Sequence, residues 1–183
     1  PVRTRVVARD PDGHGLLCRR GGKTLLLVAG TPAQMGRAHG RLLRARSRFL
    51  VRRFLYGVGA ADTLRTGKWF LDRLAEIEQR TRPHTPERFI TEAEALADAA
   101  GIARRDVRFA NLLPERFHCS GVALRGKATR GGEVLHARVL DYMRDIGLQR
   151  GAAVVLFMPA GRHAWLSLGY AGMVGTVTAM NGK

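Results

Sequence analysis

Apolar residues recur every three to four positions through the first part of the chain, a spacing that predicts amphipathic helices. We expect helices over residues 31–55, 62–80 and 85–101, followed by a shorter helical turn through residues 107–112. The first has the clearest start, because Thr31 can cap it with Gln34 as reciprocal partner and Pro32 suits its first turn. Gly36 and Gly40 lie four positions apart on this helix, which predicts the close approach of another backbone.

The apolar period changes at Cys119 from that of helices to that of strands. Short apolar runs separated by Gly, Pro or polar turns predict strands at residues 119–124, 133–140, 152–158, 163–168 and 173–180. Their connections have hairpin lengths, which favours antiparallel pairing. We therefore expect an α+β fold in which a helical segment, residues 1–118, precedes an antiparallel sheet within residues 119–183.

The chain is strongly basic, with 31 Lys and Arg against 15 Asp and Glu and a formal charge of +16. Both predicted segments share the excess, and the densest run, residues 37–53, lies on a helix that also has an apolar stripe. We therefore favour a solvated basic surface with no nucleic-acid partner. The alternative is a module that binds nucleic acid or another anionic surface through this helix.

The two cysteines, the lengths of the apolar runs and the chain ends exclude only a few classes of protein. Cys18 and Cys119 lack the paired spacing of a zinc site, and a disulfide between them stays open. No apolar run reaches the roughly 20 residues of a membrane-spanning helix. Because the chain begins with Pro1 and stops soon after a predicted strand, we expect a fragment that lacks both natural ends. Its compartment, bacterial cytoplasm or export, is left open.

The first predicted hairpin sets the position of Cys119. A turn about Thr129 pairs Leu124 with Val134, and continuing this register sets Cys119 opposite Val139.

Arg138 and Asp141 then fall within two positions of Cys119, which is close enough for a long side chain to reach it. Their spacing of three residues points them to opposite faces of a regular strand. The strand therefore has to end or bulge near Leu140 if both are to serve one site.

These residue types suit acyl transfer. A thiol with a pKa of about 8.5 is a poor nucleophile at neutral pH, and the guanidinium of Arg138 would lower that pKa. If a cut makes Cys119 the N-terminal residue, its α-amine, with a pKa of about 8, can accept the thiol proton. Asp141 can then hold the ammonium group. No metal or organic cofactor is required for this chemistry.

Simpler interpretations stand beside this one. Arg138 and Asp141 are typical of a surface ion pair at a strand end, which stabilises little. His136 shares a face with Arg138, and we favour a structural role for it over a catalytic one. Tyr142 is a weak candidate for substrate binding, and His39 is expected to be packed and hydrogen-bonded on the first helix.

Three segments resemble a known family. Cys119-Ser120 with Arg138-Val139-Leu140-Asp141 resembles the Cys-(Thr/Ser) and Arg-x-x-Asp pattern of N-terminal nucleophile (Ntn) hydrolases, which include bile salt hydrolase and acid ceramidase. The run from Gly30 to Gly36 (Gly-Thr-Pro-Ala-Gln-Met-Gly), with His39-Gly40, resembles a segment of the isopenicillin N acyltransferase type, also called acyl-CoA:6-aminopenicillanic acid acyltransferase. Met180-Asn181-Gly182 resembles the Met-Asn segment of the same type.

This resemblance implies a four-layered αββα sandwich and autocatalytic scission between His118 and Cys119. Cys119, Arg138 and Asp141 would form the catalytic core. The oxyanion-hole Asn and further substrate residues are expected beyond Lys183, so we expect the chain as given to be incomplete for activity.

Scission would divide the chain into two parts. Residues 1–118 would be a helical pro-segment (α chain) that stays bound as a partner, and residues 119–183 would begin the catalytic β chain. The leading hypothesis is an autoprocessed amidohydrolase or acyltransferase that acts on linear amide (C–N) bonds through an acyl-thioester on Cys119. A small amide or acyl donor would be its substrate. A relative that keeps the fold but is never cut, and is not catalytic, is the further alternative.

Overall fold

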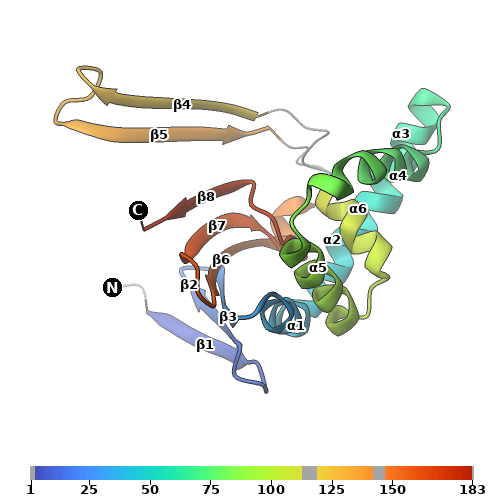
Figure 1. The fold of residues 1–183 in the computed structure, drawn as a ribbon, viewed down its shortest axis with the longest axis horizontal. Coiled ribbons are helices and arrows are strands. Elements are labelled where there is room, and N and C mark those ends of the chain that lie inside the picture. Colours follow the sequence, from blue (N-terminus) through green and yellow to red (C-terminus); the bar gives the residue numbers. More distant parts are fainter. Residues whose placement is uncertain (1–2, 113–118, 142–146, 183) are drawn as a thin grey trace.

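The structure is a computed structural model that describes residues 3–112, 119–141 and 147–182. They form an α+β fold in which a group of helices lies against one side of a six-stranded sheet (Figure 1). A separate two-stranded hairpin projects beyond this body. Among the helices of the described ranges, none has both the length and the apolar character needed to cross a membrane.

The strands of the main sheet are β1 (Thr4–Arg9), β2 (Gly15–Arg20), β3 (Lys23–Gly30), β6 (Ala152–Pro159), β7 (Trp165–Tyr170) and β8 (Thr178–Asn181). The hairpin consists of β4 (Cys119–Gly126) and β5 (Gly132–Leu140). The α-helices are α1 (Pro32–Leu42), α2 (Arg44–Arg52), α3 (Gly59–Thr66), α4 (Phe70–Thr81), α5 (Glu87–Ala100) and α6 (Arg104–Leu112). A π-helical segment, η1 (Arg53–Val58), and the 3-10 turns η2 (Arg82–His84) and η4 (Leu148–Gly151) complete the described elements.

The main sheet is mixed and has the strand order β1-β2-β3-β6-β7-β8. β3 and β6 are parallel, from Leu25 opposite Val154 to Gly30 opposite Pro159, whereas the other neighbouring strands are antiparallel. The antiparallel pairing predicted within residues 119–183 is confirmed for β4 with β5, β6 with β7 and β7 with β8. The parallel pair involves β3, which lies outside that range, and it makes the main sheet mixed. The chain between β3 and β6 includes the whole helical layer, and such a long crossover allows the two strands to run in the same direction.

The expectation of a helical segment over residues 1–118 is wrong for residues 4–30, which form β1, β2 and β3. The reason is visible in β3, where Leu26 and Val28 are buried and the residues between them, Leu25 and Leu27, are half-buried. A strand that is covered in part on both sides gives a short continuous apolar run instead of an alternating one. Periodicity alone does not assign such a run to a strand.

The predicted start of the first helix is confirmed. Thr31 is the N-cap of α1, its side chain accepts from the Gln34 backbone N–H, and the Gln34 side chain accepts from the Thr31 N–H at 2.8 Å. The single helix expected up to residue 55 is instead interrupted at Leu43, where α1 ends and α2 begins. The second predicted helix is interrupted at Gly67, whose left-handed backbone (φ 68°) ends α3 before α4 begins.

The close approach predicted from the two glycines of α1 is also confirmed. A Cβ atom on Gly36 would collide with the backbone carbonyl of Glu92, and one on Gly40 would collide with that of Leu96. Both carbonyls belong to α5. The absence of two side chains thus allows the backbones of α1 and α5 to touch, which fixes the separation of the two helices.

His39 joins α1 to the loop that follows β7. Its side chain is fully buried, and its Nε2 atom accepts a hydrogen bond from the Gly172 backbone N–H at 3.1 Å. Burial lowers the pKa of the imidazole to about 4, so the ring is neutral at pH 7. The expected packed and hydrogen-bonded histidine is therefore confirmed.

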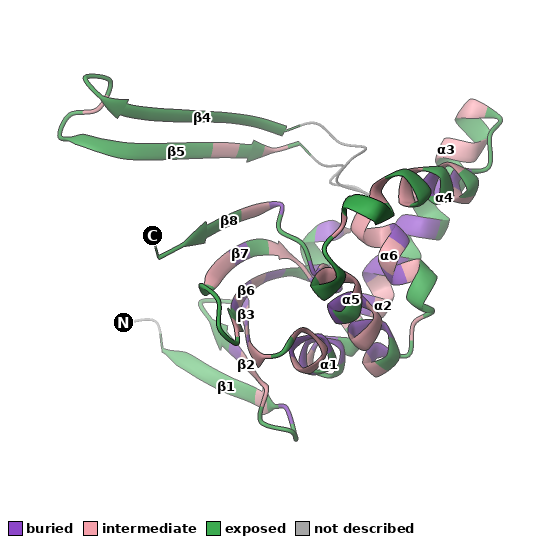
Figure 2. Ribbon diagram, viewed as in Figure 1, coloured by how far each residue is buried: buried purple, intermediate pink, exposed green. Residues whose placement is uncertain are grey.

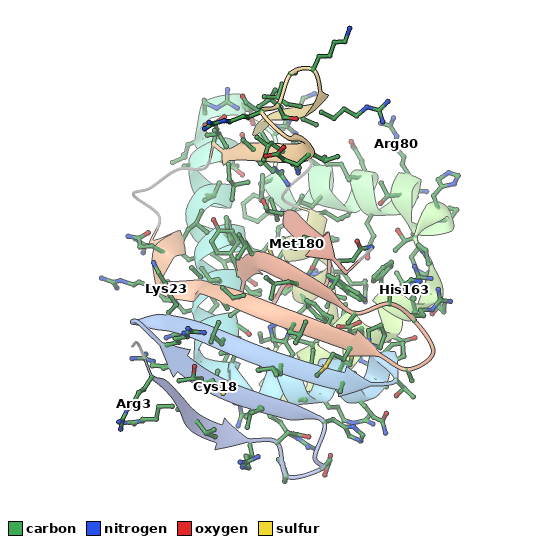
Figure 3. All side chains as sticks on the ribbon, turned by 90° about the vertical axis from the view of Figure 1, so that its left-hand side faces the viewer. Arg3, Cys18, Lys23, Arg80, His163 and Met180 are labelled. Atoms are coloured by element: carbon green, nitrogen blue, oxygen red, sulfur yellow. The ribbon has the colours of Figure 1, made fainter. Side chains whose placement is uncertain are left out.

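The two faces of the main sheet differ in their cover. The face toward the helices carries buried side chains such as Leu26, Val155 and Phe157, which form the core. The opposite face, which we call the open face, lies in front of the helices in Figure 3. It is also apolar, yet Leu168 and Met180 on it are 51% and 67% exposed, and the outer strands are largely green in Figure 2.

We expect Gly36→Ala to lower the free energy of unfolding by about 1–3 kcal/mol, since the added methyl group forces α1 away from α5. Urea denaturation measures this change. The matched control is Gly57→Ala in η1, where the nearest atom to the added Cβ is 3.8 Å away. The control should unfold at an equal or higher urea concentration, because Ala is a better helix former than Gly. Equal losses in the two variants would contradict the close-packing argument.

Protonation of His39 gives a second expectation. The folded-state pKa lies near 4 and the ordinary value is 6.5, so between these values the unfolded chain binds a proton that the folded chain does not. The stabilisation is complete above pH 6.5 and is lost as the pH falls toward 4, with a slope of up to about 1.4 kcal/mol per pH unit. His39→Gln keeps an acceptor for the Gly172 N–H but has no imidazole to protonate. Its free energy of unfolding, measured by denaturation between about pH 4 and 6.5, should therefore lack this pH dependence. An unchanged pH dependence would contradict it.

Candidate functional site

Cys119 is the first residue of β4, and its side chain is exposed. Its sulfur is a free thiol, as is that of Cys18, which is buried in β2. The disulfide that the sequence left open is therefore not formed. Of the two thiols, only that of Cys119 is open to solvent or to a reacting molecule.

The pairing of β4 with β5 differs by one residue from the predicted register. Leu124 pairs with Leu135 and not with Val134, and Cys119 lies opposite Leu140 and not opposite Val139.

A β-bulge near the turn explains the difference. Gly126 pairs with Gly132, which centres the turn on Thr129 as expected. Beyond this pair, two residues of β5, Glu133 and Val134, face the single residue Arg125 of β4. The extra residue moves every later pair by one position.

The shifted register brings Arg138 to the same face of the hairpin as Cys119. Arg138 lies opposite Gly121 and is the diagonal neighbour of Cys119 across the two strands. Such diagonal positions are roughly 7–8 Å apart, within reach of a guanidinium. β5 ends at Leu140, and Asp141 is the first residue after it. The predicted strand end near Leu140 is therefore confirmed.

The three side chains do not touch one another. Among the described residues, no hydrogen bond or ion pair joins Cys119, Arg138 and Asp141, so the surface ion pair considered from the sequence is not formed either. Cys119 and Asp141 are exposed, and Arg138 is half-buried. His118 and Tyr142 lie outside the described residues, so the predicted scission bond and the predicted substrate-binding tyrosine have no described geometry.

The hairpin is amphipathic. Cys119, Arg138 and the exposed His136 share one face. The opposite face carries the apolar side chains Val122, Leu124, Leu135 and Val139, which are between 41% and 59% exposed. His136 thus lies on the face of the candidate nucleophile and makes no hydrogen bond within the described part of the chain.

Arginines of the basic run at residues 37–53 bind within the protein. Arg41 forms an ion pair with the buried Asp10 at 3.1 Å. The Nε atoms of Arg44 and Arg48 donate to the Ala100 carbonyl at 3.2 and 2.7 Å, respectively. This carbonyl ends α5, and cations are favourable at helix C-termini. These contacts give the run a structural role and weaken the argument for a nucleic-acid surface.

Sequence reasoning missed two buried polar groups, Glu92 and Trp165. Glu92 is 2% exposed, and no hydrogen-bond partner reaches its Oε1 atom or the Nε1 atom of Trp165. One signal was present in the sequence, because Glu92 falls on the apolar stripe of α5 with Phe89 and Leu96. Within the described ranges, no group of three His, Cys, Asp or Glu side chains is arranged to hold a metal ion.

No protein-family model matches the chain. It is similar to two proteins of Dictyostelium discoideum. Protein dcd1A is 28% identical over 181 residues, which cover 84% of this chain and 41% of that protein. Protein dcd1B is 25% identical over 155 residues, which cover 74% of this chain and 31% of that protein. The chain therefore spans less than half the length of each relative, and these identities leave its family a matter for proposal.

The different burial of the two thiols can be tested with a thiol-specific reagent. Under native conditions Cys119 should react rapidly, whereas Cys18 should react only as the protein unfolds, because a buried thiol excludes the reagent. Cys119→Ser should remove the rapid phase, and the matched variant Cys18→Ser should keep it. A rapid reaction at both positions in the native protein would contradict the described burial.

Proposed function

We propose that this chain belongs to an autoprocessed amidohydrolase or acyltransferase of the Ntn type, with Cys119 as the nucleophile. The observation that carries the proposal is the position of Cys119. It is an exposed thiol at the first residue of a strand, with a guanidinium on the same hairpin face and a carboxylate just beyond the partner strand. The motifs that resemble the Ntn family support the same assignment.

Each residue then has a defined chemical role. Arg138 stabilises the thiolate of Cys119 during the reaction, since a nearby cation favours the charged form. Once Cys119 is N-terminal, its α-amine accepts the thiol proton and later returns it. Asp141 fixes the ammonium group. These roles require the three side chains to approach one another more closely than the described positions, in which no hydrogen bond or ion pair joins them.

Scission follows from the same nucleophile. The Cys119 sulfur attacks the carbonyl carbon of the preceding residue, a C–S bond forms, and the C–N bond to Cys119 breaks as its nitrogen takes up a proton. Water then hydrolyses the thioester, which leaves a carboxylate on residue 118 and a free amine on Cys119. In later turnovers an amide substrate takes the place of the preceding residue, and either water or an amine accepts its acyl group.

A second apolar layer completes this proposal. The open face of the main sheet and the apolar face of the hairpin both lack cover, and apolar faces of this kind are normally buried against another element. We propose that β4 and β5 belong to a second sheet that packs over the open face, as an αββα sandwich requires. The exposed Leu168 and Met180 on the main sheet, and Val122 and Val139 on the hairpin, then become buried.

Scission can be tested by mass spectrometry of the full-length protein, because the chain as given is expected to be incomplete for activity. We expect two fragments whose masses correspond to a cut before Cys119. Cys119→Ala should stay uncut and lack amidase activity, since it has no nucleophile, whereas the matched control Cys18→Ala should be cut as the wild type is. An uncut wild-type protein without activity would identify a noncatalytic relative. An uncut wild-type protein with activity unaffected by Cys119→Ala would refute the proposal.

The role of Arg138 gives a quantitative expectation. Arg138→Gln should slow scission by about tenfold or more, since the thiolate then loses the stabilisation of a nearby cation. Arg125→Gln, at the bulge of the same hairpin, is the matched control and should be cut at the wild-type rate. Equal rates in all three proteins would remove Arg138 from the mechanism.

A further inference from the structure

A cleft of about 430 Å³ opens at the end of the parallel strand pair, where Gly30 of β3 lies opposite Pro159 of β6. Its walls come from these strand ends, from the first turns of α1 and α5, and from Trp165 at the start of β7. His163, labelled at the edge of the sheet in Figure 3, also lines it. Clefts of several hundred cubic ångströms hold small organic molecules.

Two polar atoms in this cleft have no partner. Glu92 is almost fully buried, and its Oε1 atom makes no hydrogen bond with any described residue. The Nε1–H of Trp165 is buried in the same wall and is likewise without an acceptor. The indole ring stacks on Phe157 with centroids 4.9 Å apart, which holds this donor in position. Buried polar groups are nearly always paired, and these two unpaired atoms belong to residues that line one cleft.

The carboxyl group of Glu92 is the next feature of the cleft. The backbone carbonyl of the same residue lies against Gly36 of α1, which fixes its place on α5. Burial raises the pKa of the carboxyl group to about 8, so at pH 7 it is mostly protonated and can donate a hydrogen bond. Two residues that line the cleft therefore carry a donor, the Glu92 carboxyl and the Trp165 indole, and a small change of rotamer turns either donor toward a ligand.

The charges around the cleft favour an anion. Arg88, Arg162 and His163 line it, and Glu92, the one acid among the described lining residues, is mostly neutral. Neither guanidinium forms an ion pair within the described part of the chain. That of Arg88 lies 4.6 Å from the centroid of the Phe89 ring. Unpaired guanidinium groups bind carboxylates through charge-assisted hydrogen bonds.

Apolar side chains form the remaining wall. Pro32, Met35 and Phe89 line the cleft beside Trp165. They provide a surface for an aliphatic or aromatic group, whereas the polar atoms orient a charged end.

We propose that this cleft binds a small organic carboxylate, with its oxygens toward Arg88, Arg162 and the Trp165 indole and its apolar part against Met35 and Phe89. The assignment does not depend on the proposed function, because none of these residues belongs to the hairpin that carries Cys119.

Hexanoate is a suitable probe, and hexan-1-ol has the same tail without the charge. The experiment is a titration of the intact protein followed by ¹H–¹⁵N NMR of the indole N–H groups. Trp165 should shift and saturate with hexanoate, while Trp69, which is exposed near the start of α4, serves as the internal control and should not move. Hexan-1-ol should bind at least about tenfold more weakly, since it lacks the charge-assisted hydrogen bonds.

Variants test the named contacts. Arg88→Gln and Arg162→Gln should each weaken hexanoate binding by about tenfold, and Arg20→Gln, an exposed arginine on β2, should leave it unchanged. Arg88 and Arg162 are both exposed, so their variants should fold normally.

Three results would overturn the assignment. The first is the absence of a Trp165 shift below about 10 mM hexanoate, a concentration at which any specific site of this kind should be filled. The second is equal binding of hexan-1-ol and hexanoate. The third is equal weakening by Arg162→Gln and Arg20→Gln, which would indicate a nonspecific effect of charge.

Discussion

The parallel pairing of β3 with β6 joins the parts of the chain that precede and follow Cys119. Six consecutive residue pairs, from Leu25 with Val154 to Gly30 with Pro159, form this ladder at the centre of the main sheet. The core side chains that face the helices come from both strands, including Leu26 and Val155. Without this pairing the sheet would divide into two antiparallel units, neither of which could cover the helical layer alone.

The same pairing bears on the proposed scission. A cut before Cys119 would leave β1, β2 and β3 in one fragment and β6, β7 and β8 in the other, with the central ladder and the core between them intact. His39 adds a hydrogen bond across the same division, from α1 to Gly172. The pro-segment would therefore remain a structural part of the processed protein, since its removal would expose the core.

The two candidate sites differ in how firmly the surrounding structure holds their residues in place. Cys119 and Asp141 are exposed and Arg138 is half-buried, and among the described residues no hydrogen bond or ion pair joins the three. The cleft beside Glu92 and Trp165 is already enclosed by the packing of α1 against α5 and by the strand ends. The tight helix contact at Gly36 holds the backbone of Glu92, and the stacked ring of Phe157 holds Trp165. The cleft is thus preorganised, whereas the hairpin site is not.

The sequence by itself determined the local features of this protein. The cap at Thr31, the close helix contact at Gly36 and Gly40, the end of α5 at Gly101, and the end of β5 at Leu140 follow from interactions among near neighbours or from the absence of a side chain. Only the tertiary structure decided the parallel partner of β3 and the placing of Glu92 and Trp165 at one cleft, because these features depend on residues far apart in the chain. The one-residue shift in the hairpin is local, but the alternation of apolar residues does not reveal which strand carries a bulge. Apolar periodicity reports which side of an element is buried, but it does not report against which element that side is packed.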